Sequence, residues 1–215
     1  MTSENLSVSW LGRQDYQSCW EAMQKFTNER NENTLDEIWL LEHHPVFTQG
    51  QNGKAEHILS PGDIPIVQTD RGGQVTYHGP GQLMVYTLID LQRKKLNVRQ
   101  FVSLLEESVI ELLEQYGIDA KAKCEAPGVY VDNKKICSIG LRVRRGFAYH
   151  GIAFNIEMDL APFDRINPCG FTGLKMTQLA SLTEAKPLIE IGRELTSHFS
   201  KKLGYTKQTF QHKAE

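Results

Sequence analysis

Hydrophobic residues recur at helical spacing in three segments of the chain. Over Asp15–Glu29 they lie on one face, at Tyr16, Cys19, Trp20, Met23 and Thr27. A longer stripe lies between Asn97, a good N-cap, and Gly117, a typical C-terminal residue; its members are Val98, Phe101, Val102, Leu105, Val109, Leu112, Leu113 and Tyr116. A third helix is predicted over about Lys186–Leu203, ending at Gly204.

Segments rich in β-branched and aromatic residues predict strands between these helices. The predicted strands are Leu6–Leu11, Glu37–Phe47, Ile64–Thr69, Leu83–Leu91, Gly128–Val131, Lys135–Val143 and Phe147–Glu157. Asp132-Asn133 and Arg145-Gly146 predict the turns that connect the last three of them as antiparallel neighbours. Strands in runs between flanking helices predict an α+β fold with a mostly antiparallel sheet. We expect one domain over residues 1–215, with 205–215 as a variable tail.

Composition narrows the class of protein. The chain has 215 residues, of which 40% are hydrophobic and 23% are charged, and this composition is typical of a globular protein. Its net charge is −2, whereas a protein that coats nucleic acid is strongly basic. We find no apolar leader and no apolar run near 20 residues, so we expect a cytoplasmic protein. The cysteines and histidines lack the spacing of a zinc or disulfide framework, and we expect no metal.

The segment Arg71–Gln82, RGGQVTYHGPGQ, is the most unusual part of the sequence. Its four glycines and one proline favour a backbone that approaches a ligand closely, although a long hairpin loop is the alternative. It matches neither the dinucleotide fingerprint nor the P-loop. His78 within it is a base, a ligand or a packing residue.

Cys169 stands apart from the other cysteines because Pro168 and Gly170 flank it outside any periodic segment. A sterically open thiol in a loop is a candidate nucleophile. Its activator is His78, His150 or a lysine. The remaining cysteines differ: Cys19 and Cys137 fit apolar core patterns, and Cys124 has no assigned role.

A basic run without acidic residues extends over 134–145. It contains Lys134, Lys135, Arg142, Arg144 and Arg145. It is either a solvated hairpin or a docking patch for an acidic protein. RNA is the poorer alternative, because no aromatic residues are interleaved with the charges.

Several of these segments together resemble a known family. They are Arg71–Gln82, Gly128–Val131 followed by Lys135-Ile136, Ser138–Gly140, His150–Asn155 and Ile166–Gly170. In this order they are similar to the octanoyltransferases of lipoate biosynthesis, and the similarity extends from about Leu6 to Leu203.

The resemblance implies the fold of the catalytic domain of lipoate-protein and biotin-protein ligases. It implies transfer of an octanoyl group from acyl carrier protein to one lysine of a lipoyl domain, in 2-oxoacid dehydrogenases and the glycine cleavage H protein. A lipoyl-carrier protein is a second donor in this family. The implied partners include neither nucleic acid nor membrane, and no cofactor is required.

The resemblance also implies roles for individual residues. Cys169 is the acyl-thioester nucleophile, and Lys135 tunes it. The implied substrate-binding residues are Arg71, Gly72, Gly73, Gln74, Val75, Thr76, Tyr77, His78, Ser138, Ile139, Gly140, Gly151, Ile152 and Ala153. Backbone N–H groups of the glycine loops are plausible oxyanion donors.

Two other functions compete with this interpretation. An ATP-dependent lipoate-protein ligase on the same fold would need an adenylate site and no cysteine nucleophile, so Cys169 argues against it. A non-catalytic binder of lipoyl domains or carrier proteins would explain the basic run but not the combination of Cys169 and Lys135. A thioester donor already stores its energy, which agrees with the absence of a phosphate-binding sequence.

Overall fold

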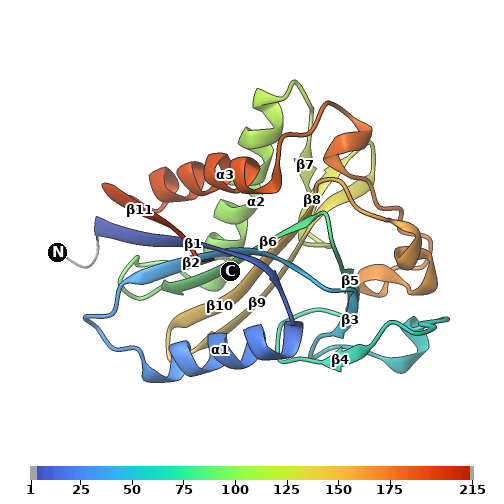
Figure 1. The fold of residues 1–215 in the computed structure, drawn as a ribbon, viewed down its shortest axis with the longest axis horizontal. Coiled ribbons are helices and arrows are strands. Elements are labelled where there is room, and N and C mark those ends of the chain that lie inside the picture. Colours follow the sequence, from blue (N-terminus) through green and yellow to red (C-terminus); the bar gives the residue numbers. More distant parts are fainter. Residues whose placement is uncertain (1–3, 214–215) are drawn as a thin grey trace.

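The computed structural model describes residues 4–213, which form two β-sheets and three α-helices (Figure 1). The larger sheet has the strand order β11-β1-β2-β6-β10-β9-β8-β7. Its strands are β1 Asn5–Gln14, β2 Asp36–His43, β6 Gln82–Asp90, β7 Lys121–Ala122, β8 Gly128–Val131, β9 Lys134–Arg144, β10 Phe147–Asn155 and β11 Lys207–His212. Within it, β1 pairs in parallel with β2 and β11, and the other neighbours are antiparallel. The predicted α+β fold with a mostly antiparallel sheet is confirmed.

The helices form close to where the hydrophobic spacing predicts them, and side chains cap two of them. They are α1 Tyr16–Glu29, α2 Val98–Gln115 and α3 Leu188–Lys202. The Asp15 carboxylate accepts a hydrogen bond from the Ser18 backbone N–H at 2.9 Å. Asn97 and Gln100 form a reciprocal capping box at the start of α2, with both hydrogen bonds at 2.9 Å.

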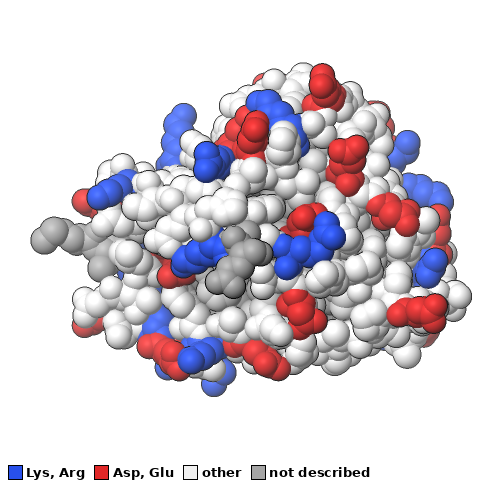
Figure 2. Space-filling view, in the orientation of Figure 1, with Lys and Arg blue, Asp and Glu red and all other residues white. Residues whose placement is uncertain are grey.

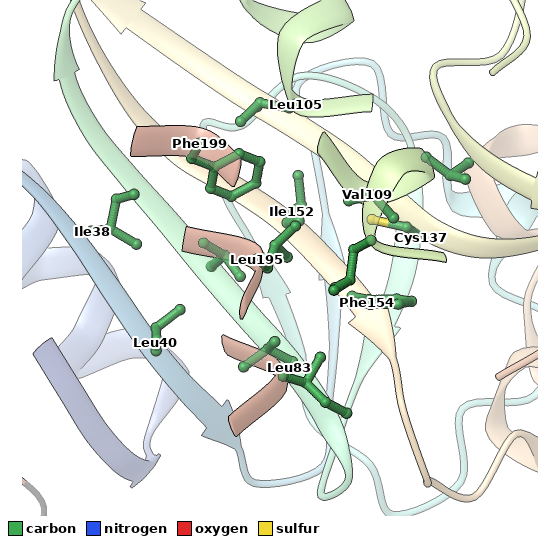
Figure 3. Packing of buried hydrophobic residues seen from close by; sticks show 14 of the residues in the cluster. Ile38, Leu40, Leu83, Leu105, Val109, Cys137, Ile152, Phe154, Leu195 and Phe199 are labelled. Atoms are coloured by element: carbon green, nitrogen blue, oxygen red, sulfur yellow. The ribbon is translucent and has the colours of Figure 1, made fainter. Parts of the chain in front are cut away.

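The large sheet is covered on both faces, by α2 and α3 on one side and by α1 on the other (Figure 1). Strand β6 is buried along its whole length. Its alternate residues Leu83 and Val85 belong to the larger core with α2 and α3, and Met84 and Tyr86 to the smaller one with α1. Figure 3 shows the larger core, in which Cys137 lies beside hydrophobic side chains as predicted.

A smaller sheet carries the glycine-rich segment and corrects two predictions. It has the order β4-β3-β5, with β3 Val46–Gln49, β4 Ile66–Gln68 and β5 Val75–His78. The single strand predicted over Glu37–Phe47 is wrong: β2 ends before Pro45, which has no N–H to continue a ladder, and β3 joins the other sheet. The loop predicted over Arg71–Gln82 contains β5, so it is not loop throughout. Short 3-10 helices complete the fold: η2 Ala55–His57, η3 Ala161–Arg165, η4 Pro168–Gly170 and η5 Leu179–Ser181.

Two more features depart from the predicted elements. The tail after Gly204 forms strand β11, which pairs in parallel with β1. Just before it, the Tyr205 hydroxyl donates a hydrogen bond to the Asp36 carboxylate at 2.7 Å. Val98 is 47% exposed, so the buried stripe of α2 starts at Phe101. Across residues 4–213, none of the helices has both the length and the apolar character to cross a lipid bilayer.

Candidate active site

Cys169 and Lys135 meet although they are 34 residues apart in the chain. The Lys135 ammonium donates a hydrogen bond to Cys169 Sγ at 3.1 Å. Cys169 lies in η4 with a positive φ of 57°, and Lys135 is the second residue of β9. The lysine is 1% exposed, whereas the cysteine is partly open to solvent. The thiol is therefore accessible, and its cationic neighbour is fixed within the protein.

Backbone hydrogen bonds hold Lys135 on both sides. Its N–H donates to the Lys175 carbonyl at 2.9 Å, and its own carbonyl accepts from the Thr177 N–H at 2.9 Å. Its ammonium also donates to the Pro127 carbonyl at 3.1 Å. The segment 175–177 thus runs beside β9 like a short extra strand and sets the position from which the lysine side chain starts.

Gly128 packs closely against the Lys135 side chain and is bound by the carboxylate of Glu106. A Cβ on Gly128 would lie 3.1 Å from Lys135 Cε and 2.5 Å from the Cys137 carbonyl oxygen, and φ at Gly128 is 138°, so only glycine fits there. The Gly128 N–H donates to the Glu106 carboxylate at 2.8 Å. Burial acts to lower the pKa of Lys135, but the charge and hydrogen-bond interactions with Cys169 and Tyr130 together outweigh it, and the pKa is raised. The lysine is therefore an ammonium at neutral pH.

A cavity of about 420 Å³ adjoins this pair. Every residue of the predicted substrate-binding set except Tyr77 lines this cavity. Cys169, Lys135 and His150, one of the candidate activators of the thiol, also line it. So do residues that the sequence did not single out for the site: Tyr16, Asn52, Met84, Tyr86, Val98, Val102, Glu125, Ala126, Pro127, Leu141 and Phe171. Most of this lining is apolar, which suits an aliphatic chain.

Tyr77 does not line this cavity. Its ring packs between Phe47 and Phe163, with ring centroids 5.6 Å and 5.5 Å away. On β5 the neighbours Thr76 and His78 line the cavity, whereas Tyr77 belongs to the core of the small sheet. We therefore assign Tyr77 a packing role.

Arg71 organises the glycine-rich segment from inside. Its buried guanidinium donates to the carbonyls of Gly72 and Gln74 at 2.9 Å and 2.8 Å, and to the Thr48 hydroxyl of β3 at 2.8 Å. The chain from 71 to 74 therefore curls around one side chain. In this arrangement the arginine shapes the wall of the cavity.

Both ring nitrogens of His78 form hydrogen bonds within the protein. The Thr48 hydroxyl, which already accepts from Arg71, donates to His78 Nε2 at 3.1 Å, and Nδ1–H donates to the Gln82 side chain at 2.7 Å. Burial lowers the pKa of His78 well below its usual value, so the ring is neutral. Neither ring nitrogen is left for Cys169.

The hydrogen bonds continue from Gln82 to the lysine. The Gln82 amide donates to Asn155 Oδ1 at 2.9 Å, and Asn155 Nδ2 donates to the Thr177 carbonyl at 2.9 Å. Thr177 is the residue whose N–H binds the Lys135 carbonyl. Sequence reasoning missed this chain, although both amide residues lie within segments that it had singled out.

His150, the other histidine considered for Cys169, binds an acid instead. A φ of 60° turns its ring to the side of Tyr149, on which it stacks at 5.0 Å, and its Nε2 donates to Asp70 at 2.8 Å. The Tyr149 hydroxyl donates to the same carboxylate. The sequence left His78, His150 or a lysine as the activator of Cys169, and the geometry brings a lysine to the thiol.

The residues of the basic run lie at the two opposite ends of β9. Lys134 and Lys135 start β9, whereas Arg142 and Arg144 lie at its far end, about 23–30 Å from Lys135 at about 3.3 Å per residue. Lys135 is buried and belongs to no surface patch. Arg145 Nη2 donates to the carbonyls of residues 27 and 28, and Arg142 donates to the side chain of residue 51. The basic run is therefore not one cluster, and the alternative of a docking patch for an acidic protein stays a prediction for its exposed residues.

The other cysteines lie as the sequence predicts. Cys19 lies on the buried face of α1, where burial raises the pKa of its thiol to about 12. Burial raises the pKa of Cys137 as well. Cys124 is exposed. In residues 4–213 no three His, Cys, Asp or Glu side chains gather in a way that would hold a metal ion.

Comparison with known proteins places the chain in a family. The model of the lipoyl protein ligase A/B catalytic domain matches residues 15–200. Octanoyltransferases of Shewanella amazonensis and Shewanella oneidensis are each 56% identical over 205 residues, or 95% of this chain and 95% and 94% of theirs. The chain belongs to the octanoyltransferase family. The sequence-based recognition is confirmed.

Solved structures with the same fold come from two classes of ligase. A lipoate-protein ligase A bound with ATP superposes with a TM-score of 0.78, over 98% of this chain and 88% of that one, at 14% identity. A biotin protein ligase of Aquifex aeolicus gives a TM-score of 0.57, over 92% of this chain and 68% of that one, at 16% identity. The octanoyltransferase chain therefore has the predicted ligase-like fold.

Proposed function

We propose that this chain transfers an octanoyl group from acyl carrier protein to a lysine of a lipoyl domain through a thioester on Cys169. The 3.1 Å contact between the Lys135 ammonium and Cys169 Sγ, in the wall of an apolar cavity, is the observation that carries the proposal. Identity of 56% with octanoyltransferases, against 14% with the ATP-bound ligase, favours acyl transfer over the ligase alternative. A cytoplasmic location is part of the proposal.

In the first half-reaction the Cys169 thiolate attacks the thioester carbonyl of the donor. A carbon–sulfur bond forms to Sγ, and the bond to the pantetheine sulfur breaks. The Lys135 ammonium stabilises the thiolate before attack, since opposite charges at this distance favour the charged form of each group. It then gives a proton to the departing sulfur, so the donor leaves as a neutral thiol.

In the second half-reaction the amine of the acceptor lysine attacks the Cys169 thioester. An amide bond forms, and Cys169 leaves as a thiolate. The proton that the amine loses goes to the now neutral Lys135, which restores the starting ammonium–thiolate pair. One lysine thus serves both steps, and the protons balance without a cofactor.

The substrate-binding set divides into two kinds of contribution in this proposal. Gly140 and Gly151 line the cavity with backbone, and Gly151 must be glycine because a Cβ there would lie 1.9 Å from the Val85 carbonyl oxygen of the neighbouring strand. Arg71 and His78 keep the opposite wall in shape through hydrogen bonds within the protein. Apolar contact with this lining holds the octanoyl group.

Mass spectrometry after mixing with octanoyl-acyl carrier protein tests the proposal. We expect the protein to gain the mass of one octanoyl group and to lose it on treatment with hydroxylamine, which cleaves thioesters. Cys169→Ala should abolish both loading and transfer, while the control Cys19→Ala should retain them. Octanoyl transfer by the Cys169→Ala protein at the wild-type rate would refute the thioester mechanism. Consumption of ATP during transfer would restore the ligase alternative.

A further inference from the structure

A second hollow, of about 900 Å³, adjoins the cavity of the active site. We call it the lysine groove; it is lined by Lys123, Cys124, Glu125, Ala126, Tyr130, Asp132, Asn133, Lys134, Phe171, Thr172, Gly173, Leu174 and Lys175. Glu125, Ala126 and Phe171 also line the cavity that holds Cys169. The two hollows therefore share a wall, and the groove leads from the surface toward the thiol.

Three exposed lysines from three separate segments converge on this groove. Lys123 follows β7, Lys134 starts β9, and Lys175 precedes the segment that binds Lys135. The lining of the groove also holds two acids, Glu125 and Asp132, and Lys175 forms an ion pair with Asp164 at 3.6 Å. On the face drawn in Figure 2, acidic and basic side chains are interspersed. Lys123 and Lys134 form no ion pair within residues 4–213, so these two lysines supply the positive charge that the groove offers to a ligand.

The uncharged lining of the groove suits a long and partly polar chain. Phe171, which is 45% exposed, presents aromatic surface, whereas Tyr130 is buried behind the lining. Asn133 and Thr172 offer an amide and a hydroxyl. Gly173 has a φ of 77°, and no atom lies within 4 Å of the position that a Cβ would take there. The groove thus combines apolar contact, hydrogen-bonding groups and cations along one path.

We infer that the lysine groove binds the phosphopantetheine arm of the acyl donor and leads its thioester to Cys169. This inference rests on the proposed function. The arm is a flexible chain with amide groups, and it ends in a phosphate attached to an acidic carrier protein. Lysines recognise phosphate as point charges, and a cationic rim accelerates encounter with an acidic partner. The arginines at the far end of β9 are about 23–30 Å from Lys135, too far to contact an arm bound in this groove.

Loading kinetics with matched donors test the inference. We compare octanoyl-pantetheine with octanoyl-phosphopantetheine, which differ only in the phosphate, and with octanoyl-acyl carrier protein. Lys123→Glu and Lys175→Glu should each lower the ratio of kcat/KM for the phosphorylated donor over the unphosphorylated one by about tenfold, because a carboxylate repels the phosphate. The matched control Arg144→Glu makes the same charge change at the far end of β9 and should leave the ratio as it is. An unchanged ratio in both lysine variants overturns the inference.

Cys124 allows a direct test of proximity. In a Cys169→Ala protein, Cys124 is the exposed thiol among the described residues, since Cys19 and Cys137 are buried. Carrier protein whose pantetheine sulfur is activated as a thiopyridine disulfide should form a mixed disulfide with Cys124 and release thiopyridone. The control adds Cys124→Ser and Arg144→Cys, and its adduct should form at least tenfold more slowly. Equal rates at both positions contradict the inference.

The acceptor is the competing occupant of the groove. If the lysine variants leave the donor ratio unchanged and instead raise KM for the lipoyl domain in the second half-reaction, the groove takes the acceptor and the inference is wrong. Failure of the proposed function has a different signature, because the wild-type protein would then gain no octanoyl group from any donor.

Discussion

Lys135→Met is the sharpest single test of the catalytic pair. Methionine keeps most of the buried volume of the lysine and removes its charge. The thiol of Cys169 then loses the ammonium at 3.1 Å that stabilises its anionic form. We expect Cys169 to become alkylated only at higher pH, and octanoyl loading at neutral pH to fall.

The size of the effect follows from the distance and the burial. At an effective dielectric near 20, two unit charges at this separation attract by about 5 kcal/mol. Desolvation of the buried ammonium and the partial exposure of Cys169 reduce this attraction to about half. At about 1.4 kcal/mol per pH unit, the remaining attraction shifts the pH profile of alkylation by about two units. In the variant less of the thiol is ionised at pH 7, but the more basic thiolate is a better nucleophile, with a Brønsted coefficient of about 0.4–0.5. This gain offsets about half of the loss, so the alkylation rate at pH 7 should fall by about tenfold.

The assay is the rate of iodoacetamide labelling between pH 5 and pH 10 in a Cys124→Ser background. Cys19 and Cys137 are buried, so the signal comes from Cys169. Lys134→Met is the control, because it removes the same charge from an exposed neighbour whose side chain points to the opposite face of β9. Coincident pH profiles for wild type and Lys135→Met would refute the assignment of Lys135 as the activator of the thiol.

Two further predictions concern groups behind the active site. Asn155→Asp replaces the donor to the Thr177 carbonyl by an acceptor, and we expect kcat for octanoyl loading to fall about tenfold at nearly unchanged KM; an unchanged kcat in a folded protein would contradict this positioning role. Burial lowers the pKa of His43 to about 4 from about 6.5, so the unfolded chain binds more protons than the folded one between these pH values. The free energy of unfolding therefore decreases as the pH falls from about 6.5 to about 4, and His43 contributes about 3 kcal/mol to this decrease. Urea unfolding at pH 7 and pH 5 should show a smaller difference for His43→Asn than for wild type, and equal differences would assign the acid sensitivity to other groups.

Local patterns in the sequence predicted most of the elements. The 3.6-residue spacing on α1, α2 and α3 and the glycines after α2 and α3 report backbone geometry within one segment, and that geometry holds in the folded protein. The Pro-Cys-Gly setting of Cys169 is also local, and it marked the thiol as the open one. One of the wrong predictions, the single strand across Pro45, also has a local cause, because a proline interrupts that run of strand-forming residues.

Contacts between distant segments were decided only by the tertiary structure. Sequence spacing left a histidine or a lysine as the partner of Cys169, and the pairing of β9 with the segment 175–177 brings Lys135 to it. The run of basic residues over 134–145 looked like one cluster, but an extended strand separates its ends by the full length of β9. A periodic pattern specifies which face of a segment is buried; which segments then share that face depends on strand order and register, which are properties of the whole chain.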